Sequence, residues 1–361
     1  MVGLVRSPST GRVGVPFSAR FHSARPGRNP GGRLVGGLRM SPAPDLGHRP
    51  VMLAEIVELF RTVPPGVLFD GTLGGAGHSR AVLGAHPGLR LVGLDRDPDA
   101  VAAATVALAG FGERATVLRA RFSEAGPALD ASGATRISGA LLDLGVSSWQ
   151  LDRAERGFGY RHDGPLDMRM DPTSGPSAAD LVATLPVGEL ARLLADYGDE
   201  RFADRVARAI VAARPVTTTG RLAEVVRDAI PAATRRRGGH PARRTFQALR
   251  IAVNDELGQL PGTIDELIGR LAPGGRIAVI SYHSGEDRIV KDRLRRAATG
   301  DCRCPPGLPC VCGAQPSLRL LGRSARRPTD TEIASNRRAE SARLRAAERL
   351  PTERLPTESQ P

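Results

Sequence analysis

Short apolar runs alternate with helical patterns between residues 67 and 145, and this alternation limits the possible folds more than any other feature. Four runs have the length and composition of buried strands: residues 67–70, 89–95, 115–120 and 139–145. Helical patterns follow the first run from His78 and the second run over Asp99–Leu108. Strands that alternate with helices build a parallel sheet covered on both faces, so we predict a doubly wound α/β domain.

The alternation stops after the fourth strand. Residues 157–171 form a loop rich in glycine, aspartate and methionine, and apolar side chains at helical spacing follow it. Two such stripes are Leu190, Leu193, Leu194 and Tyr197, and Phe202, Val206 and Ile210. We predict a long helix from Thr245 towards Leu260, a second helical segment over 265–271 and a returning strand over 274–283. The simplest architecture is one α/β domain with an all-helical insertion after its fourth strand.

The chain carries 51 basic and 38 acidic side chains, a net charge of +13. Seven arginines lie in residues 1–44, which contain no acid, and subtracting them leaves +6 for the rest. A body of this charge is still suited to a nucleic-acid partner. The chain contains no run of about 18 apolar residues, which excludes a membrane-spanning helix.

The composition and the patterns together divide the chain. The first residues are rich in Gly, Pro and Ser and have no helical or strand period, so we predict a disordered extension over 1–47. A transit peptide and a later start at Met40 are the alternatives. The α/β domain is predicted over 48–149 and 245–350, the helical insertion and substrate domain over 150–244, and a disordered tail over 351–361.

The loop after the first predicted strand contains glycines at 71, 74, 75 and 77. Glycine lets a ligand approach the unpaired N–H groups at the start of a helix. The spacing does not fit G-x-G-x-x-G, which disfavours a nicotinamide-dependent oxidoreductase. Asp95 ends the second strand, Phe122 follows the third and Asp143 lies on the fourth. Because ligands of open α/β sheets bind along this carboxyl edge, we predict a nucleoside site there.

Five strings occur in one order along the chain: GTLGGAGHS over 71–79, LLDLGVSS over 141–148, DGPLDMRMD over 163–171, RTFQALR over 244–250, and SYHS over 281–284 with EDR over 286–288. From about His48 to Leu350 the chain closely resembles the RsmH (MraW) family of ribosomal RNA cytosine-N4 methyltransferases. The resemblance implies a Rossmann-like class I methyltransferase sheet with a helical insertion and S-adenosylmethionine as cofactor. It also implies N4-methylation of a cytosine, of the cytosine-1402 class, in the decoding centre of 16S ribosomal RNA.

The resemblance assigns cofactor contacts residue by residue. It places Ala76, Gly77 and His78 at the loop-to-helix turn, Asp95 on the ribose, Phe122 near the adenine, and Asp143 and Gln150 at the methionine end. Three positions depart from the family pattern: Ala76 for a glycine, Trp149 for a proline and Gly285 for a leucine. We expect Ala76 to be tolerated where only backbone N–H is used, Trp149 to affect the orientation of Gln150, and Gly285 to loosen its turn.

Methylation of the exocyclic amine of cytosine needs in-line placement and an acceptor for its N–H. Asp143 is our first candidate for orienting the cofactor or the amine. Asp163, Asp167 and His283 are second candidates for contacting the cytosine; each is alternatively a loop cap or a satisfied buried polar group. Methylation at cytosine C5 is disfavoured, because it needs a thiolate near the base and the cysteines all lie after residue 301.

Arginines are the expected phosphate contacts: Arg235, Arg236, Arg237, Arg243 and Arg244 in the insertion, and Arg319, Arg323, Arg326, Arg327, Arg337 and Arg338 in the tail. The candidates for base stacking are Trp149, Phe158, Tyr160 and Tyr282. The implied partner is 16S ribosomal RNA in the small ribosomal subunit, in the cytoplasm, with no membrane partner and the oligomeric state open. A DNA cytosine-N4 methyltransferase and a non-catalytic ribosome-assembly factor are the alternative functions.

Four cysteines lie close together, at 302, 304, 310 and 312. One residue separates the members of each pair, whereas zinc knuckles usually have two. Disulfides are unexpected in a cytosolic protein. We therefore predict reduced thiols on a loop and no metal site, with a structural zinc as the alternative.

Overall fold

A mixed sheet carries the residues predicted to form the site. The computed structural model describes residues 50–235, 239–305 and 311–351. The strand order is β3-β2-β1-β4-β5-β7-β6. The strands are β1 (Gly66–Asp70), β2 (Leu89–Asp95), β3 (Ala115–Arg119), β4 (Ile137–Asp143), β5 (Leu271–Ser281), β6 (Leu318–Leu320) and β7 (Arg343–Arg349). Strands β1 to β5 are parallel, and β7 is antiparallel to both β5 and β6. This order confirms the predicted Rossmann-like methyltransferase sheet.

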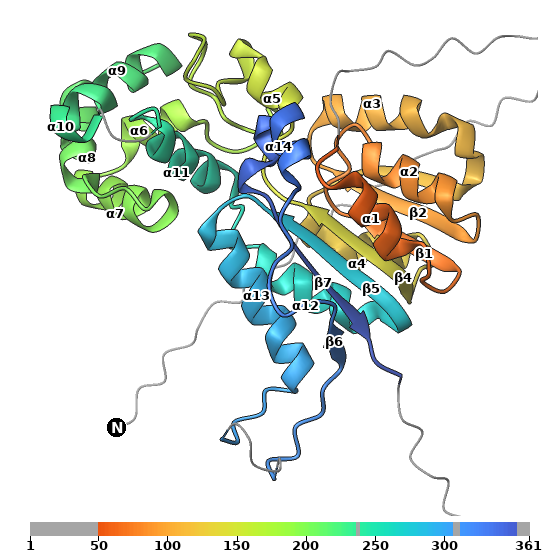
Figure 1. Cartoon of the computed structure of the whole chain (residues 1–361). Helices are drawn as coiled ribbons and strands as arrows, with labels where there is room; N and C mark the ends of the chain where they lie inside the picture. Colours follow the sequence, from red (N-terminus) through yellow and green to blue (C-terminus); the bar gives the residue numbers. More distant parts are fainter. Residues whose placement is uncertain (1–49, 236–238, 306–310, 352–361) are drawn as a thin grey trace, which may run out of the picture. The chain divides into compact units, whose positions relative to one another are not determined.

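Helices cover both faces of the sheet (Figure 1). One face packs on α1 (Leu53–Phe60), α2 (Gly77–Ala85) and α3 (Pro98–Leu108); the other packs on α4 (Ala125–Ala131), α12 (Leu260–Arg270) and α13 (Ser284–Thr299). Strand β1 shows why: Val67 and Phe69 enter one hydrophobic cluster and Leu68 enters the other. Side chains alternate between the faces of a strand, so a continuous apolar run marks a strand that is buried on both faces.

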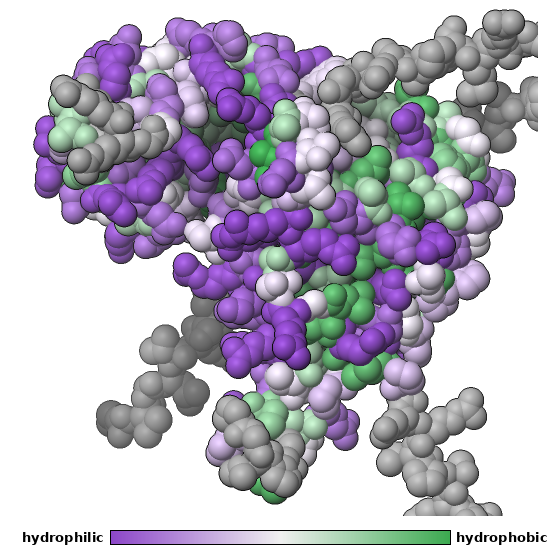
Figure 2. Space-filling model, viewed as in Figure 1, coloured by the Kyte–Doolittle hydropathy of each residue, from purple (hydrophilic) through white to green (hydrophobic). Residues whose placement is uncertain are grey.

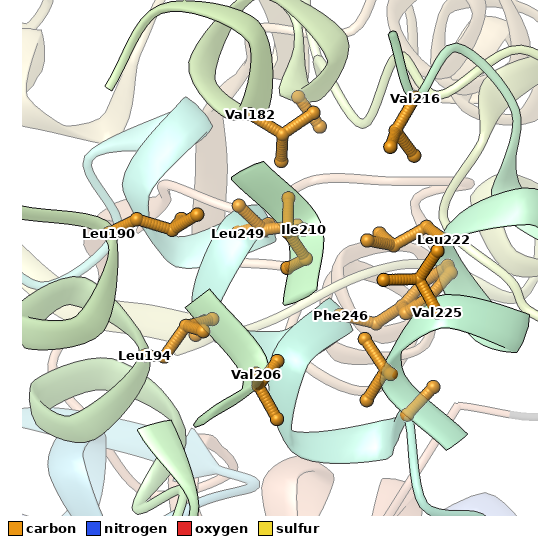
Figure 3. Packing of buried hydrophobic residues seen from close by; sticks show 14 of the residues in the cluster. Val182, Leu190, Leu194, Val206, Ile210, Val216, Leu222, Val225, Phe246 and Leu249 are labelled. Atoms are coloured by element: carbon orange, nitrogen blue, oxygen red, sulfur yellow. The ribbon is translucent and has the colours of Figure 1, made fainter. Parts of the chain in front are cut away.

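The helical insertion has its own hydrophobic cluster (Figure 3). After α5 (Ser148–Asp152) it comprises α6 (Ala178–Thr184), α7 (Val187–Gly198), α8 (Ala203–Ala212), α9 (Thr219–Ala229), α10 (Ala232–Arg235) and α11 (Arg243–Asn254). Leu190 and Leu194 of α7 meet Val206 and Ile210 of α8, as their spacing predicts, whereas Tyr197 is 37% exposed.

The cluster of the insertion also includes Phe246 and Leu249 of α11. Its hydrophobic core therefore extends past residue 244, where the sequence analysis ended the insertion. The described residues all belong to one compact unit, so the division into domains stays a prediction. The long helix predicted from 245 to 260 is wrong, because Asp255 has φ 50° in the left-handed region and ends α11 at Asn254.

The part of the α/β domain from residue 318 to 349, where no strand or helix was predicted, contributes two strands and a short helix, α14 (Asp330–Ser335). In β7 only Leu344 and Ala347 are buried, a spacing of three that hides the period-two signal of a strand. Two of the arginines expected on phosphates, Arg319 and Arg338, make ion pairs with Glu348 and Asp152 but stay exposed, so their contact with RNA stays a prediction. Within the described ranges no helix has the length and apolarity needed to cross a membrane.

Candidate active site

The turn after β1 leaves backbone N–H groups for a ligand. Ala76 lies in the left-handed region, with φ 59° and ψ 21°, and α2 begins directly after it. No described side chain caps this end of α2, so the N–H groups of its first turn are available. Apart from the neighbouring residues in the chain, no described atom lies within 4 Å of the place where Gly74 or Gly75 would carry a Cβ, so a ligand can approach the backbone there closely. Packing fixes Gly77, because a Cβ there would stand 2.4 Å from Cγ of Pro50.

Asp95 lies at the end of β2 and holds the turns on either side of it. Its Oδ2 accepts the N–H of Gly74 at 2.8 Å, and its Oδ1 accepts the N–H of Asp97 at 2.9 Å. Burial raises the pKa of Asp95 to about 6, against the lowering effect of these hydrogen bonds. Each oxygen keeps a further lone pair, so the carboxylate can accept from a diol without releasing either turn.

Asp143 ends β4 and lies among hydrogen-bonding groups from three other segments. Its N–H donates to Oγ1 of Thr72 at 2.6 Å, and its Oδ1 accepts the hydroxyl of Tyr282 at 2.8 Å. Its Oδ2 lies 3.7 Å from Nδ1 of His78. Because Nε2 of His78 lies 2.8 Å from the carbonyl of Val51, which can only accept, Nε2 carries a proton and Nδ1 faces Asp143. Burial and the charge of Asp143 raise the pKa of Tyr282, so its hydroxyl stays a donor.

Asp70 and Phe122 complete this edge of the sheet. Asp70 is buried at the end of β1, where it accepts from Oγ of Ser79 at 2.6 Å and from the N–H of Thr72 at 3.1 Å. Burial raises the pKa of Asp70. Phe122 is half-buried after β3, and its Cβ lies 3.0 Å from the place of a Cβ at Gly71. The glycine at 71 therefore lets Phe122 approach the edge where Asp95 and Asp143 lie.

Asp97 joins elements that are far apart in the sequence. Its buried carboxylate caps α3 through the N–H of Asp99 at 3.0 Å. Its Oδ2 also accepts from Nε2 of Gln150 at 2.8 Å and from Nη2 of Arg156 at 2.9 Å. The same Nη2 donates to the carbonyl of Met170 at 2.9 Å. One carboxylate thus fixes α3, α5 and the loop that contains Met170.

Gln150 is predicted to flank the methionine end of the cofactor, and the structure places its side chain in internal hydrogen bonds. Its Oε1 accepts the N–H of Ser147 at 3.1 Å, while Nε2 donates to Asp97. Trp149, which precedes it, has the guanidinium of Arg153 3.9 Å from its ring centroid. The Gln150 amide keeps a second hydrogen and a second lone pair, so its contact with the cofactor stays a prediction.

Asp163 and Asp167, both predicted to contact the cytosine, are engaged within the insertion. Asp163 is exposed and accepts the N–H of Gly220 at 2.7 Å and of Gly164 at 3.0 Å. The bond from Gly220 is the main cause of the lowered pKa of Asp163. Asp167 forms a two-point ion pair with Arg169, with N–O distances of 2.9 and 2.7 Å. Both residues hold the loop in place, and their contact with a base stays a prediction.

Asn254 is a residue that the sequence analysis missed. It is 1% exposed at the end of α11. Its Oδ1 accepts the N–H of Met170 at 2.9 Å, and its Nδ2 donates to the carbonyl of Met168 at 2.8 Å. Met168 has φ 61°, in the left-handed region that a methionine seldom adopts, so these bonds support a strained turn. The sequence feature that could have indicated Asn254 is an amide side chain at the end of an apolar helical pattern.

His283 lies at the start of α13, beside Tyr282. Its Nδ1 accepts the N–H of Glu286 at 3.4 Å, and Oε2 of Glu286 accepts the N–H of Tyr282 at 2.8 Å. The buried Nε2 lies 3.2 Å from Oε1 of Glu286, outside hydrogen-bond geometry. At Gly285 a Cβ would stand 3.2 Å from the His283 ring and from Leu257. His283 therefore caps a helix, and its contact with the cytosine stays a prediction.

Figure 2 shows mostly hydrophilic side chains on the visible face of the insertion. Arg243 and Arg244 are exposed at the start of α11, while Arg236 and Arg237 lie outside the described residues. Among the stacking candidates, Tyr160 is stacked on His240 with ring centroids 4.2 Å apart, and Phe158 is buried. The structure thus leaves the two arginines of α11 accessible to a polyanion.

The sheet edge therefore brings together the predicted residues Ala76, Gly77, His78, Asp95, Phe122 and Asp143. The same edge also contains Asp97, which was not predicted, and Tyr282, which was predicted for base stacking and here donates its hydroxyl to Asp143. This arrangement offers backbone N–H groups, a carboxylate for a diol and a carboxylate beside a tyrosine hydroxyl. Such a set can bind a nucleoside and orient a polar group opposite it.

Comparison with known proteins identifies the family. The model of the MraW methylase family matches residues 45–350. The chain is 52% identical over 309 residues to ribosomal RNA small subunit methyltransferase H of Heliobacterium modesticaldum, covering 84% of this chain and 98% of that relative. It is 54% identical over 318 residues to the protein of the same name from Thermobifida fusca, covering 86% and 95% of the two chains. On the extent of both similarities, the chain belongs to the MraW methylase family.

Proposed function

We propose that this chain transfers a methyl group from S-adenosylmethionine to N4 of a cytosine in 16S ribosomal RNA. The observation that carries the proposal is the meeting of the open turn after β1, Asp95 and Asp143 at one edge of the sheet. The relatives are named as methyltransferases of small-subunit ribosomal RNA. We further propose that the target lies in the decoding centre and that the substrate is the small ribosomal subunit.

The residues at the sheet edge fit the proposed cofactor. The open backbone at Gly74 and Gly75 and the uncapped start of α2 suit a ligand that needs close approach and N–H donors. The Asp95 carboxylate suits a ribose diol, and Phe122 supplies an apolar surface for a base. S-adenosylmethionine supplies an electrophilic methyl group when it is bound there. Ala76 contacts the cofactor through its backbone only in this proposal. The alanine in place of the family's glycine therefore costs only the strain of a left-handed backbone conformation, about 1 kcal/mol.

Asp143 orients the acceptor amine in this proposal. The amine of cytosine is a poor nucleophile because its lone pair is delocalised into the ring, and a carboxylate that accepts its N–H favours a pyramidal nitrogen. Tyr282 donates to Oδ1 of Asp143, and Nδ1 of His78 lies 3.7 Å from Oδ2, so the carboxylate is held in a defined orientation at the tip of β4. In-line placement then supplies much of the rate enhancement. A thiolate mechanism at C5 is disfavoured, since the three cysteines among the described residues, Cys302, Cys304 and Cys312, lie together in the segment after α13.

The helical insertion contributes the RNA-binding surface in this proposal. Arg243 and Arg244 are exposed at the start of α11. The other end of α11 anchors the loop that contains Met168 and Met170. One helix thereby links a basic surface to the loop that Asp97 and Arg156 hold against α3. A base inside folded RNA must be turned out of its stack before it reaches a strand tip.

Nucleoside analysis tests the proposed reaction. In cells that lack this chain, we expect N4-methylcytosine to disappear from small-subunit ribosomal RNA and to return with the wild-type gene. Mass spectrometry of digested RNA measures this. In vitro, purified chain should label small-subunit particles rather than duplex DNA, which separates an RNA enzyme from a DNA enzyme. Unchanged N4-methylcytosine in the deletion strain would contradict the reaction and favour a non-catalytic assembly factor.

The affinity for the cofactor should fall as the pH drops below about 6, where Asp95 becomes protonated. Ribose hydroxyls donate to the ionised carboxylate, so binding favours the form that exists above this pKa. The limit is about tenfold per pH unit, as for any ligand that binds only the deprotonated form. Isothermal titration with S-adenosylhomocysteine between about pH 5 and pH 8 measures the slope.

The matched control for this titration is Asp95→Asn, which should bind more weakly and without the pH slope. The same slope in that variant would assign the titration to another group.

The free chain should show the opposite trend in stability. Because the pKa of Asp95 is raised from 3.8, its stabilising contribution is complete below about pH 4 and is lost as the pH rises through about 6.

A further inference from the structure

The segment between α13 and β6 has no part in the proposed reaction, and its described residues contain three of the four cysteines. The base of the segment is closed by the N–H of Ser317, which donates to the carbonyl of Ala297 at 2.8 Å. Gly300 has φ 60°, and a Cβ there would lie 2.5 Å from backbone atoms of Gln315. The two arms of the segment are thus in backbone contact just before the cysteines begin.

The three cysteine sulfurs converge beyond this base. The Sγ atoms of Cys302, Cys304 and Cys312 all lie within 4.8 Å of one another. The Cys302 and Cys312 sulfurs are 3.6 Å apart, far longer than the roughly 2.05 Å of a disulfide bond. Four thiolates at about 2.3 Å from a tetrahedral zinc are separated by about 3.8 Å along each edge. The Cys302–Cys312 distance is close to this edge, and the other two sulfur pairs lie within 4.8 Å, near enough for all three thiolates to share one zinc ion.

Hydrophobic packing does not account for this convergence. None of the described residues from 301 to 317 is buried, and Val311 is 89% exposed. Cysteine is otherwise among the most buried residue types, because its thiol behaves as a small apolar group. Solvent-accessible thiols that come together from both ends of a segment with no hydrophobic core are typical of a loop that a metal ion stabilises.

We propose that Cys302, Cys304 and Cys312 bind a structural zinc ion as thiolates. Each thiol releases its proton to solvent when the metal binds, so binding strengthens as the pH rises. The described residues supply three of the four ligands that tetrahedral zinc takes, and Cys310 lies outside them. The ion would tie the end of α13 to the start of β6. One intervening residue between Cys302 and Cys304 suffices here because Cys312 meets both from the other arm.

Metal content of the full chain tests the proposal. Chain purified under reducing conditions, without chelator and from zinc-supplemented cells, should contain about one zinc per molecule. The Cys302→Ser/Cys312→Ser variant should contain less than about a tenth of that amount. Arg303→Ser is the matched control, because it changes the exposed residue between two ligands and should keep the zinc. Cobalt added to metal-free wild type should give the visible absorption of a tetrahedral thiolate site.

A second measurement uses the wild-type chain alone, so it does not depend on the folding of any variant. Removal of zinc with a chelator should speed tryptic cleavage after Arg303, and added zinc should restore protection. Reduced wild type that carries no zinc and takes up no cobalt would overturn the proposal. A disulfide between Cys302 and Cys312 in the native chain, detected as a mass lower by two hydrogens, would overturn it as well.

Discussion

The Asp143→Ala variant should lose methyl transfer by about a hundredfold to a thousandfold in kcat while it keeps its affinity for RNA. Removal of one preorganised polar group beside reacting atoms has an effect of this size. Asp143 lies at the tip of β4, where Thr72 fixes its backbone and Tyr282 fixes one carboxylate oxygen. Loss of the carboxylate removes the acceptor that orients the amine. Single-turnover transfer from radiolabelled S-adenosylmethionine to small-subunit particles measures the rate, and filter binding measures RNA affinity.

Two further variants separate chemistry from packing. Asp143→Asn keeps the shape and still accepts from Tyr282 but lacks the charge, so its rate should fall nearly as far. Tyr282→Phe keeps the carboxylate charge and removes one charge-assisted hydrogen bond of about 1.5–3 kcal/mol, so its rate should fall by about tenfold to a hundredfold, less than in Asp143→Ala. An Asp143→Ala chain that melts like the wild type and methylates at the wild-type rate would remove Asp143 from the mechanism.

Strands β1, β2 and β4 were predictable because burial on both faces of a strand favours a run of mostly apolar residues. Residues 89–95 were predicted as a strand and are β2, from Leu89 to Asp95. Strand β7 was not predictable in the same way. It carries four charged residues among seven and buries only Leu344 and Ala347, so its place in the sheet depends on pairing with β5. Pairing between distant segments leaves no local period to detect.

The same distinction holds for the candidate site: residues at strand ends could be predicted, whereas residues that only the fold brings together could not. Asp95 and Asp143 were predictable because the carboxyl ends of parallel strands meet at one edge of a sheet. The joint roles of Asp97 and Arg156 were not, since 59 residues separate them and only the fold brings them to 2.9 Å. Asn254 likewise acts on a loop 84 residues before it. A single sequence marks where a strand ends, but it does not mark which distant donor a buried carboxylate will meet.

Asp97 is therefore the residue whose loss should destabilise the chain most. Its buried carboxylate accepts from the Asp99 N–H, Gln150 and Arg156. In Asp97→Asn the new amide hydrogens face these donors, and the Arg156 guanidinium is left without its closest anionic partner. Breaking a buried ion pair by removing one charge costs about 3–5 kcal/mol. We expect a loss of that size in the free energy of unfolding.

Asp99→Asn is the matched control, because it removes the charge of a half-exposed carboxylate only two residues after Asp97. Asp99 lies 3.1 Å from Arg153 and 3.5 Å from Arg156, with 47% of its side chain exposed. Exposed pairs contribute about 0–1 kcal/mol, so this variant should unfold close to the wild type. Urea titrations followed by the fluorescence of Trp149, the only tryptophan of the chain, report on this region directly. If the two variants lost the same small stability, Asp97 would not be what holds Arg156 and the loop of Met170 in place.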